Sequence, residues 1–174
     1  MRKLSRSLLG GLAVTSLLYV GSGVWADDDH QQFKARLQGF NEVPAISSTG
    51  RGEFTARIHG DGSAVDWKLR YEGLEGTITT ASHIHLGQKD VNGGVSVFFC
   101  GGPTTPVCTN PSGSFSGTFT AADVGGPVAQ GIAPGEIAEL IRAIRAGKTY
   151  ANVHTNKHPG GEIRGQVRRD HDDD

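Results

Sequence analysis

The sequence is poor in residues on which several classes of protein depend. Of its 174 residues, one is methionine, at position 1, and two are cysteine. A blue-copper electron carrier is disfavoured, because its metal needs a free cysteine thiolate and usually an axial methionine. The chain also lacks a basic excess, with 17 Lys and Arg against 18 Asp and Glu. This balance argues against a nucleic-acid-binding protein, which needs a basic face to neutralise phosphates.

A long hydrophobic run is also lacking. The apolar run from Leu8 to Val20 is too short for a membrane span, and acidic residues follow it soon afterwards. Basic residues precede this run and small residues follow it, which is the pattern of a secretory signal peptide with cleavage after Ala26. We therefore expect a periplasmic or secreted protein with no integral membrane span after signal cleavage.

The two cysteines are eight positions apart. Cys100 and Cys108 enclose a short loop that contains Pro103 and Pro106. In an oxidising compartment this spacing predicts a disulfide bond. The alternative, a thiolate metal site or a redox pair, usually has closer spacing.

Charge and hydrophobicity divide the chain into four segments. Residues 1–26 are the predicted signal peptide, and residues 33–168 are the predicted folded domain. Residues 27–32 and 169–174 are rich in aspartate and have little apolar surface to bury. We expect these two acidic ends to be disordered.

Period-two alternation of apolar and polar residues dominates the predicted domain. It predicts strands over residues 33–37, 52–58, 65–71, 77–86, 94–99, 112–120, 149–155 and 162–167. One helix interrupts them after Pro134, with an apolar stripe made by Ile137, Leu140, Ile141 and Ile144. Many short strands and one helix predict an antiparallel β-sandwich or flattened barrel.

Histidines form the most informative cluster of polar residues. His83 and His85 flank Ile84 in a predicted strand, so both point to one face while Ile84 enters the core. His154 points outwards from a later strand, and His158 lies in the turn that follows. Three or four such imidazoles on the surface could bind copper or zinc. The alternative is that they are ordinary surface histidines bonded to backbone or water.

Other catalytic patterns are weak. The sequence has no G-x-S-x-G nucleophile motif and no glycine-rich phosphate loop between a strand and a helix. Its glutamates are scattered, so no carboxylate pair stands out. Glu162 and Arg164 alternate with Ile163 in the last predicted strand, which predicts cross-strand ion pairs.

Four motifs carry a family resemblance. They are N-E-V-P at 41–44, S-H-I-H-L-G at 82–87, N-V-H-T at 152–155 and P-G-G-E-I-R-G-Q at 159–166. In this order they resemble the chordin-type domain, CHRD, over residues 33 to 167. The resemblance implies a Greek-key β-sandwich of the immunoglobulin or superoxide dismutase type. In animal chordin such repeats belong to a secreted antagonist of growth-factor signalling, whereas exported single-domain microbial members mostly have no assigned activity.

The histidine pattern has a second resemblance. Copper/zinc superoxide dismutase also has an H-x-H pair on one strand and a later V-H, which would make His83, His85 and His154 copper ligands. This chain differs from that enzyme, because no histidine lies between His85 and His154 to serve as a bridging ligand.

Three functions follow from these observations. The first is an exported, non-enzymatic CHRD module whose surface histidines bind copper or zinc. The second is a metalloenzyme similar to superoxide dismutase that uses the same histidines. The third is a plain interaction module that binds an extracytoplasmic protein and has no metal site.

Overall fold

The computed structural model describes residues 31–170. The predicted signal peptide lies outside the described residues, as do most of the two acidic ends. The described residues include a few positions of both acidic ends. The backbone N–H of Asp170 donates to the carbonyl of Gln32, and Lys34 forms an ion pair with Asp170 at 2.9 Å.

The predicted all-β architecture is confirmed. The strands are β1 (Gln32–Gln38), β2 (Arg51–Ile58), β3 (Val65–Glu72), β4 (Thr79–Leu86), β5 (Gly94–Cys100), β6 (Gly113–Phe119), β7 (Thr149–Thr155), β8 (Ile163–Gln166) and β9 (Arg168–Arg169). The described part has one α-helix, α1 (Ile137–Arg145), at the predicted place, and three short 3₁₀ turns, η2 (Gly39–Asn41), η3 (Ala121–Asp123) and η4 (Val128–Gln130). None of these helices is long and apolar enough to cross a membrane.

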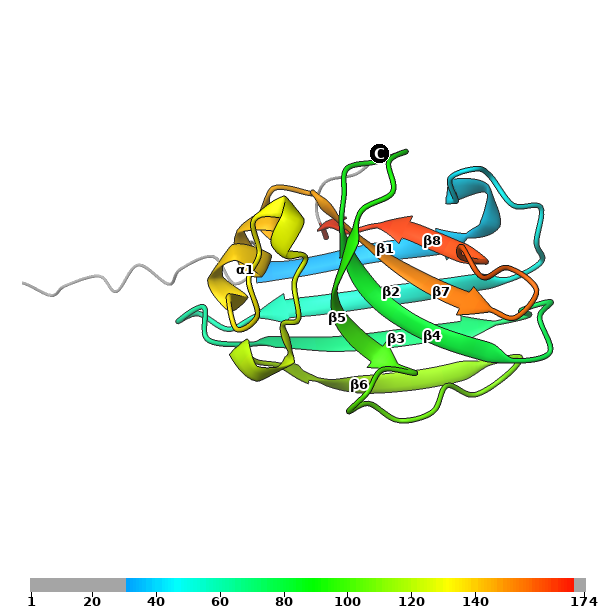
Figure 1. Ribbon diagram of the computed structural model, residues 1–174, viewed down its shortest axis with the longest axis horizontal. Coiled ribbons are helices and arrows are strands. Elements are labelled where there is room, and N and C mark those ends of the chain that lie inside the picture. The colour runs from blue at the N-terminus through cyan, green and yellow to red at the C-terminus, as the bar shows by residue number, and fades with distance from the viewer. Residues whose placement is uncertain (1–30, 171–174) are drawn as a thin grey trace, which may run out of the picture.

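The strands form one curved antiparallel sheet that folds into two layers (Figure 1). The strand order is β5-β4-β7-β8-β1-β2-β3-β6, with β9 paired to β1. One layer contains β5, β4, β7 and β8, and the other contains β1, β2, β3 and β6. The first and last strands of this order, β5 and β6, are also in contact, so the sandwich is nearly a closed barrel.

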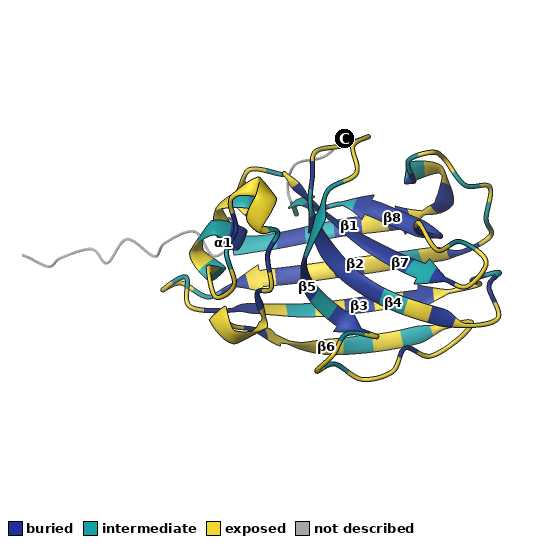
Figure 2. Ribbon diagram, in the orientation of Figure 1, coloured by how far each residue is buried: buried dark blue, intermediate teal, exposed yellow. Residues whose placement is uncertain are grey.

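The core lies between the two layers. In Figure 2, β7 is mostly buried, whereas β2 and β3 alternate between buried and exposed residues. Phe54, Trp67, Phe99 and Phe119 bring their rings together there, with centroid distances of 4.7 to 5.6 Å. The apolar stripe of α1 also enters the core through its buried leucine and isoleucines. Burial of alternate residues therefore fixes which face of each strand points inwards.

The predicted disulfide is present. Cys100, at the end of β5, is bonded to Cys108, and their Cα atoms are 5.1 Å apart. The bond ties the loop between β5 and β6 to the layer that contains the histidines.

Candidate metal centre

The three histidines of the two sequence motifs lie on neighbouring strands. β4 and β7 are antiparallel, and their register pairs His83 with Asn152 and Ala81 with His154. Ile84 and Val153 enter the core. His83, His85 and His154 therefore share the face of the layer that points away from the core, as period two predicts.

These three rings converge. One ring nitrogen from each of His83, His85 and His154 lies within 4.8 Å of the others. The ring centroids of His83 are 4.5 Å from both His85 and His154. The three histidines form the candidate metal centre.

Hydrogen bonds distinguish the two nitrogens of two of these rings. His85 Nδ1 is 2.8 Å from the carbonyl oxygen of Gly93, and His154 Nδ1 is 2.9 Å from that of Pro159. A carbonyl accepts only from N–H, so both rings carry their proton on Nδ1 and leave a lone pair on Nε2. Those two Nε2 atoms, together with His83 Nδ1, are buried and have no hydrogen-bond partner among residues 31–170.

The predicted position of the histidines on the surface is wrong. His83 is 6% exposed and His85 is 8% exposed, and His154 is half-buried. The edge of the Phe98 ring packs on His83, and the Tyr150 ring stacks on His85 at 4.6 Å. The outer face of this layer is thus covered by protein, which strand alternation alone does not reveal.

His158, the fourth predicted ligand, does not belong to this group. Its backbone N–H donates to Thr155 Oγ1 and its carbonyl accepts from Gly161, so it is held in the turn between β7 and β8. The three histidines that come together are those on the strands.

Burial keeps the three imidazoles neutral. Desolvation, together with the neighbouring His154 and His85, lowers the pKa of His83 from 6.5 to about 2. Desolvation lowers the pKa of His85 to about 4, against the hydrogen bond to Gly93, and it also lowers the pKa of His154. A metal ion needs the neutral imidazole, so no proton has to leave these rings at pH 7.

These pKa shifts predict that the metal-free protein loses stability in acid. His83 and His85 have lower pKa values when folded, so their contribution is complete above pH 6.5 and is lost as pH falls below that value, at about 1.4 kcal/mol per pH unit for each. The lowered pKa of His154 acts in the same direction. Glu42 has the opposite effect on the pH dependence of stability, because burial raises its folded pKa to about 7. Three histidines outweigh one glutamate, so urea unfolding in EDTA should show a falling free energy of unfolding from pH 6.5 to 5. A constant or rising stability over this range would contradict these shifts.

A second group of residues holds the His85 ring in position. The Tyr150 and His85 rings are nearly parallel, with an angle of 4°, and Arg164 Cζ lies 3.5 Å from the centroid of the Tyr150 ring. Gly93 N–H donates to the Tyr150 hydroxyl while the Gly93 carbonyl accepts from His85. A side chain at Gly93 would come within 1.7 Å of the Leu86 carbonyl oxygen, so only glycine fits there. Sequence reasoning did not identify these supporting residues.

Glu42 and Asn152 lie beside the centre. Glu42 Oε1 accepts from Asn152 Nδ2 at 2.6 Å, and Asn152 is the cross-strand partner of His83. Burial raises the pKa of Glu42 to about 7, against the effects of Asn152 and Arg164. The motif N-E-V-P thus places a carboxyl group over the outer face of β7, a role that its sequence does not indicate.

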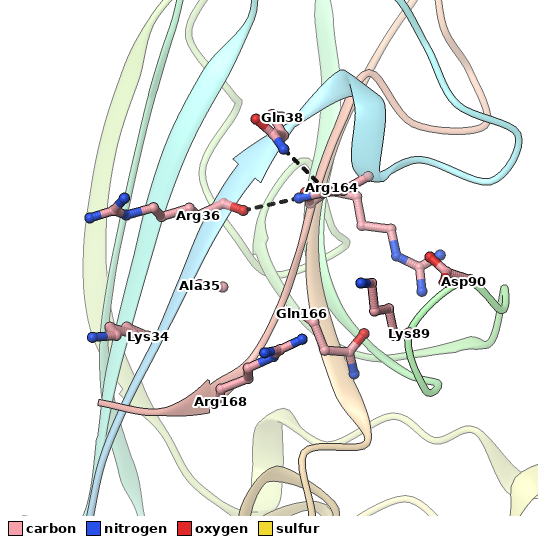
Figure 3. Close-up of a pocket in the computed structure, with 10 residues that line it drawn as sticks. Lys34, Ala35, Arg36, Gln38, Lys89, Asp90, Arg164, Gln166 and Arg168 are labelled. Atoms are coloured by element: carbon pink, nitrogen blue, oxygen red, sulfur yellow. Dashed lines mark hydrogen bonds between the residues drawn. The ribbon is translucent and has the colours of Figure 1, made fainter. Parts of the chain in front are cut away.

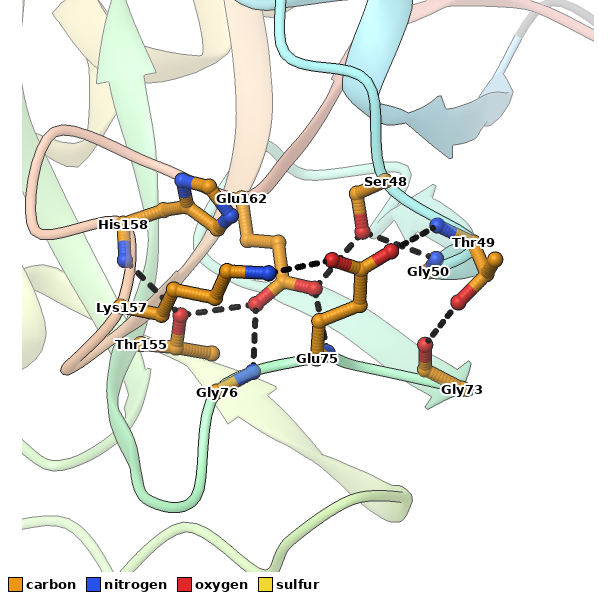
Figure 4. A network of polar contacts seen from close by, with 10 residues as sticks. All are labelled: Ser48, Thr49, Gly50, Gly73, Glu75, Gly76, Thr155, Lys157, His158 and Glu162. Atoms are coloured by element: carbon orange, nitrogen blue, oxygen red, sulfur yellow. Dashed lines mark hydrogen bonds and ion pairs between the residues drawn. The ribbon is translucent and has the colours of Figure 1, made fainter.

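Glu162 and Arg164 do not form the predicted cross-strand ion pairs. Glu162 is fully buried and accepts four hydrogen bonds, from Ser48 Oγ, Thr155 Oγ1 and the backbone N–H groups of Glu75 and Gly76 (Figure 4). Its carboxylate joins the loops before β2 and β4 to the end of β7. Burial acts to raise the pKa of Glu162, but these hydrogen bonds lower it more and keep the group ionised.

Comparison with known proteins identifies the family of this chain. The family model described as CHRD domain matches residues 33–167, which is most of the chain. No curated protein sequence matches the chain. The disulfide and this domain fit an extracellular protein. The matched span includes every strand that carries the three histidines, and the chain belongs to the CHRD-domain family.

Proposed function

We propose that this CHRD domain is an exported, non-enzymatic module that binds one copper or zinc ion. The ligands are His83 Nδ1, His85 Nε2 and His154 Nε2. The observation that carries the proposal is that these three nitrogens are buried, lack hydrogen-bond partners within the described part of the chain, and belong to rings that converge.

The chemistry of the three nitrogens supports metal binding. A buried polar atom without a partner destabilises a fold by about 1–3 kcal/mol, and three such atoms in one place are costly unless a ligand satisfies them. Copper and zinc both bind imidazole nitrogen. The zinc–nitrogen distance is about 2.0–2.1 Å, so the ligand nitrogens around one ion lie about 3.3–3.6 Å apart. The ring nitrogens lie within 4.8 Å of one another, so binding requires a contraction of at most about 1.5 Å.

The surroundings also support a metal ion. The carbonyls of Gly93 and Pro159 accept hydrogen bonds from Nδ1 of His85 and of His154, and so orient these two rings. Histidines that bind a metal usually have such a partner on the nitrogen that does not contact the ion. This arrangement leaves the Nε2 atoms of His85 and His154 available to a metal ion.

The site favours retention of a metal over turnover of superoxide. His83 and His85 are almost completely buried, so a copper ion beside them has little contact with solvent. Arg164, which could attract an anion, lies on the far side of the Tyr150 ring from His85 and donates to Asn92, Gln88 and Val91. A superoxide dismutase instead needs an open metal position that the anion can reach.

Titration of tag-free protein with Cu²⁺ and Zn²⁺ by calorimetry tests the proposal. We expect one ion per chain for at least one of the two metals, and no superoxide dismutase activity in the copper-loaded form. Absence of stoichiometric binding for both metals would support the plain interaction module instead. Rapid superoxide turnover would support the enzyme.

A further inference from the structure

A cavity of about 680 Å³ lies beside β1 and β8, separate from the histidines. Five cationic side chains line it, with a single carboxylate, that of Asp90 (Figure 3). The cations are those of Lys34, Arg36, Lys89, Arg164 and Arg168. Such an excess of positive charge in a partly enclosed space attracts anions.

Arg164 is the strongest argument for an anion. It is 2% exposed, and its guanidinium donates to three uncharged acceptors, the side-chain oxygen of Asn92 and the carbonyls of Gln88 and Val91. Within the described residues, no carboxylate forms an ion pair with it. The Tyr150 ring packs on this cation, and the Glu42 carboxyl interacts with it electrostatically but is only partly ionised at pH 7. The buried charge of Arg164 is therefore only partly compensated, and an anion in the cavity would supply the remaining counter-charge.

The remaining groups narrow the position of the anion. Figure 3 shows Lys89, Gln166 and Arg168 gathered on the same side as Arg164, whereas the side chains of Lys34 and Arg36 point the other way. Lys34 is also paired with Asp170. The binding position is therefore beside Lys89 and Arg164.

Gln166 adds an acceptor to this set of donors. Its Nε2 donates to the carbonyls of Gly87 and Gly147, which fixes the amide orientation. Its Oε1 is buried and has no partner among the residues that the structure describes. An oxyanion that carries its own proton can accept from the cations and donate to this oxygen.

We propose that the cavity binds a small oxyanion of the hydrogen phosphate type beside Lys89 and Arg164, with Gln166 Oε1 accepting its proton. The cavity leaves room for the ion together with hydration water. The site is distinct from the metal centre and does not depend on the proposed metal function.

The test is an NMR titration of metal-free protein with inorganic phosphate, in EDTA at low and constant ionic strength. We expect saturable shifts of the amide signals of residues 88–92 and of Gln166, with a Kd of about 1 mM or below. Sulfate, which carries no proton at pH 7.5, should bind several-fold more weakly. Equal binding of sulfate would overturn the role of Gln166.

Three variants separate a built site from general charge attraction. Lys89→Ala should weaken phosphate binding about fivefold, whereas Lys68→Ala, which removes an equal charge from an exposed position on β3, should leave it unchanged. Asp90→Asn should tighten binding about threefold, because it removes the one carboxylate of the lining. Asp90 has a positive φ of 63°, which asparagine tolerates. Equal losses in Lys68→Ala and Lys89→Ala, or no saturation, would overturn the proposal.

Discussion

Replacing His83 with alanine is expected to weaken copper or zinc binding at least about 100-fold. Loss of an outer partner of a metal ligand typically costs 10–100-fold in affinity, so loss of a ligand itself costs more. Replacing His154 with alanine should have a similar effect, because it removes the one ligand from β7. The measurement is the Kd from calorimetric titration of each variant, with metal-free thermal unfolding to show that the fold is retained.

Two other histidines provide matched controls. His158 lies outside the converging group, although its sequence position suggested a fourth ligand. His59 lies at the end of the β2–β3 hairpin and pairs with Asp66. Alanine at either position should leave the Kd within about twofold of the wild-type value. An equal loss in His158→Ala and His83→Ala would show that metal binds elsewhere or through a larger set of groups.

Replacing Glu162 with alanine is expected to lower the free energy of unfolding by about 3–5 kcal/mol. The carboxylate accepts from two hydroxyl groups and two backbone N–H groups, and alanine would leave these donors without a partner. For a domain with a typical stability of about 5–15 kcal/mol, this loss is severe. Urea unfolding monitored by tryptophan fluorescence measures it.

Glu75 is the matched control for Glu162. It lies in the same network but is partly exposed, where it pairs with Lys157 (Figure 4). Glu75→Gln should cost less than about 1 kcal/mol, because exposed ion pairs contribute little. If Glu162→Ala costs no more than Glu75→Gln, the buried carboxylate does not join the loops as described.

Most of the fold could be predicted from alternation in the sequence. The β2–β3 hairpin is an example, because Phe54 and Leu69 alternate with polar neighbours and face each other in the register. The helix was equally clear, since Ile137 to Ile144 repeat at helical spacing. Alternation indicates which residues are buried between the layers, and in this fold it therefore indicates where the strands lie in the sequence. It does not report which strands are neighbours in the sheet.

The candidate site could be predicted only in part. Period two placed His83 and His85 on one face, and His154 was expected to join them if β4 and β7 were neighbours, as they are. Their burial was not predictable, because the groups that cover this face come from other parts of the chain, such as Phe98 on β5. His158 was predicted as a fourth ligand and lies outside the converging group in the structure, since the path of a turn has no periodic signal.

The central claim is that one ion is held by His83, His85 and His154. Anomalous diffraction from crystals of copper- or zinc-loaded protein, recorded at the absorption edge of the metal, tests it most directly. The expected result is one peak, about 2.0–2.2 Å from His83 Nδ1, His85 Nε2 and His154 Nε2. A peak at other residues, or no peak in crystals soaked with either metal, would contradict the claim.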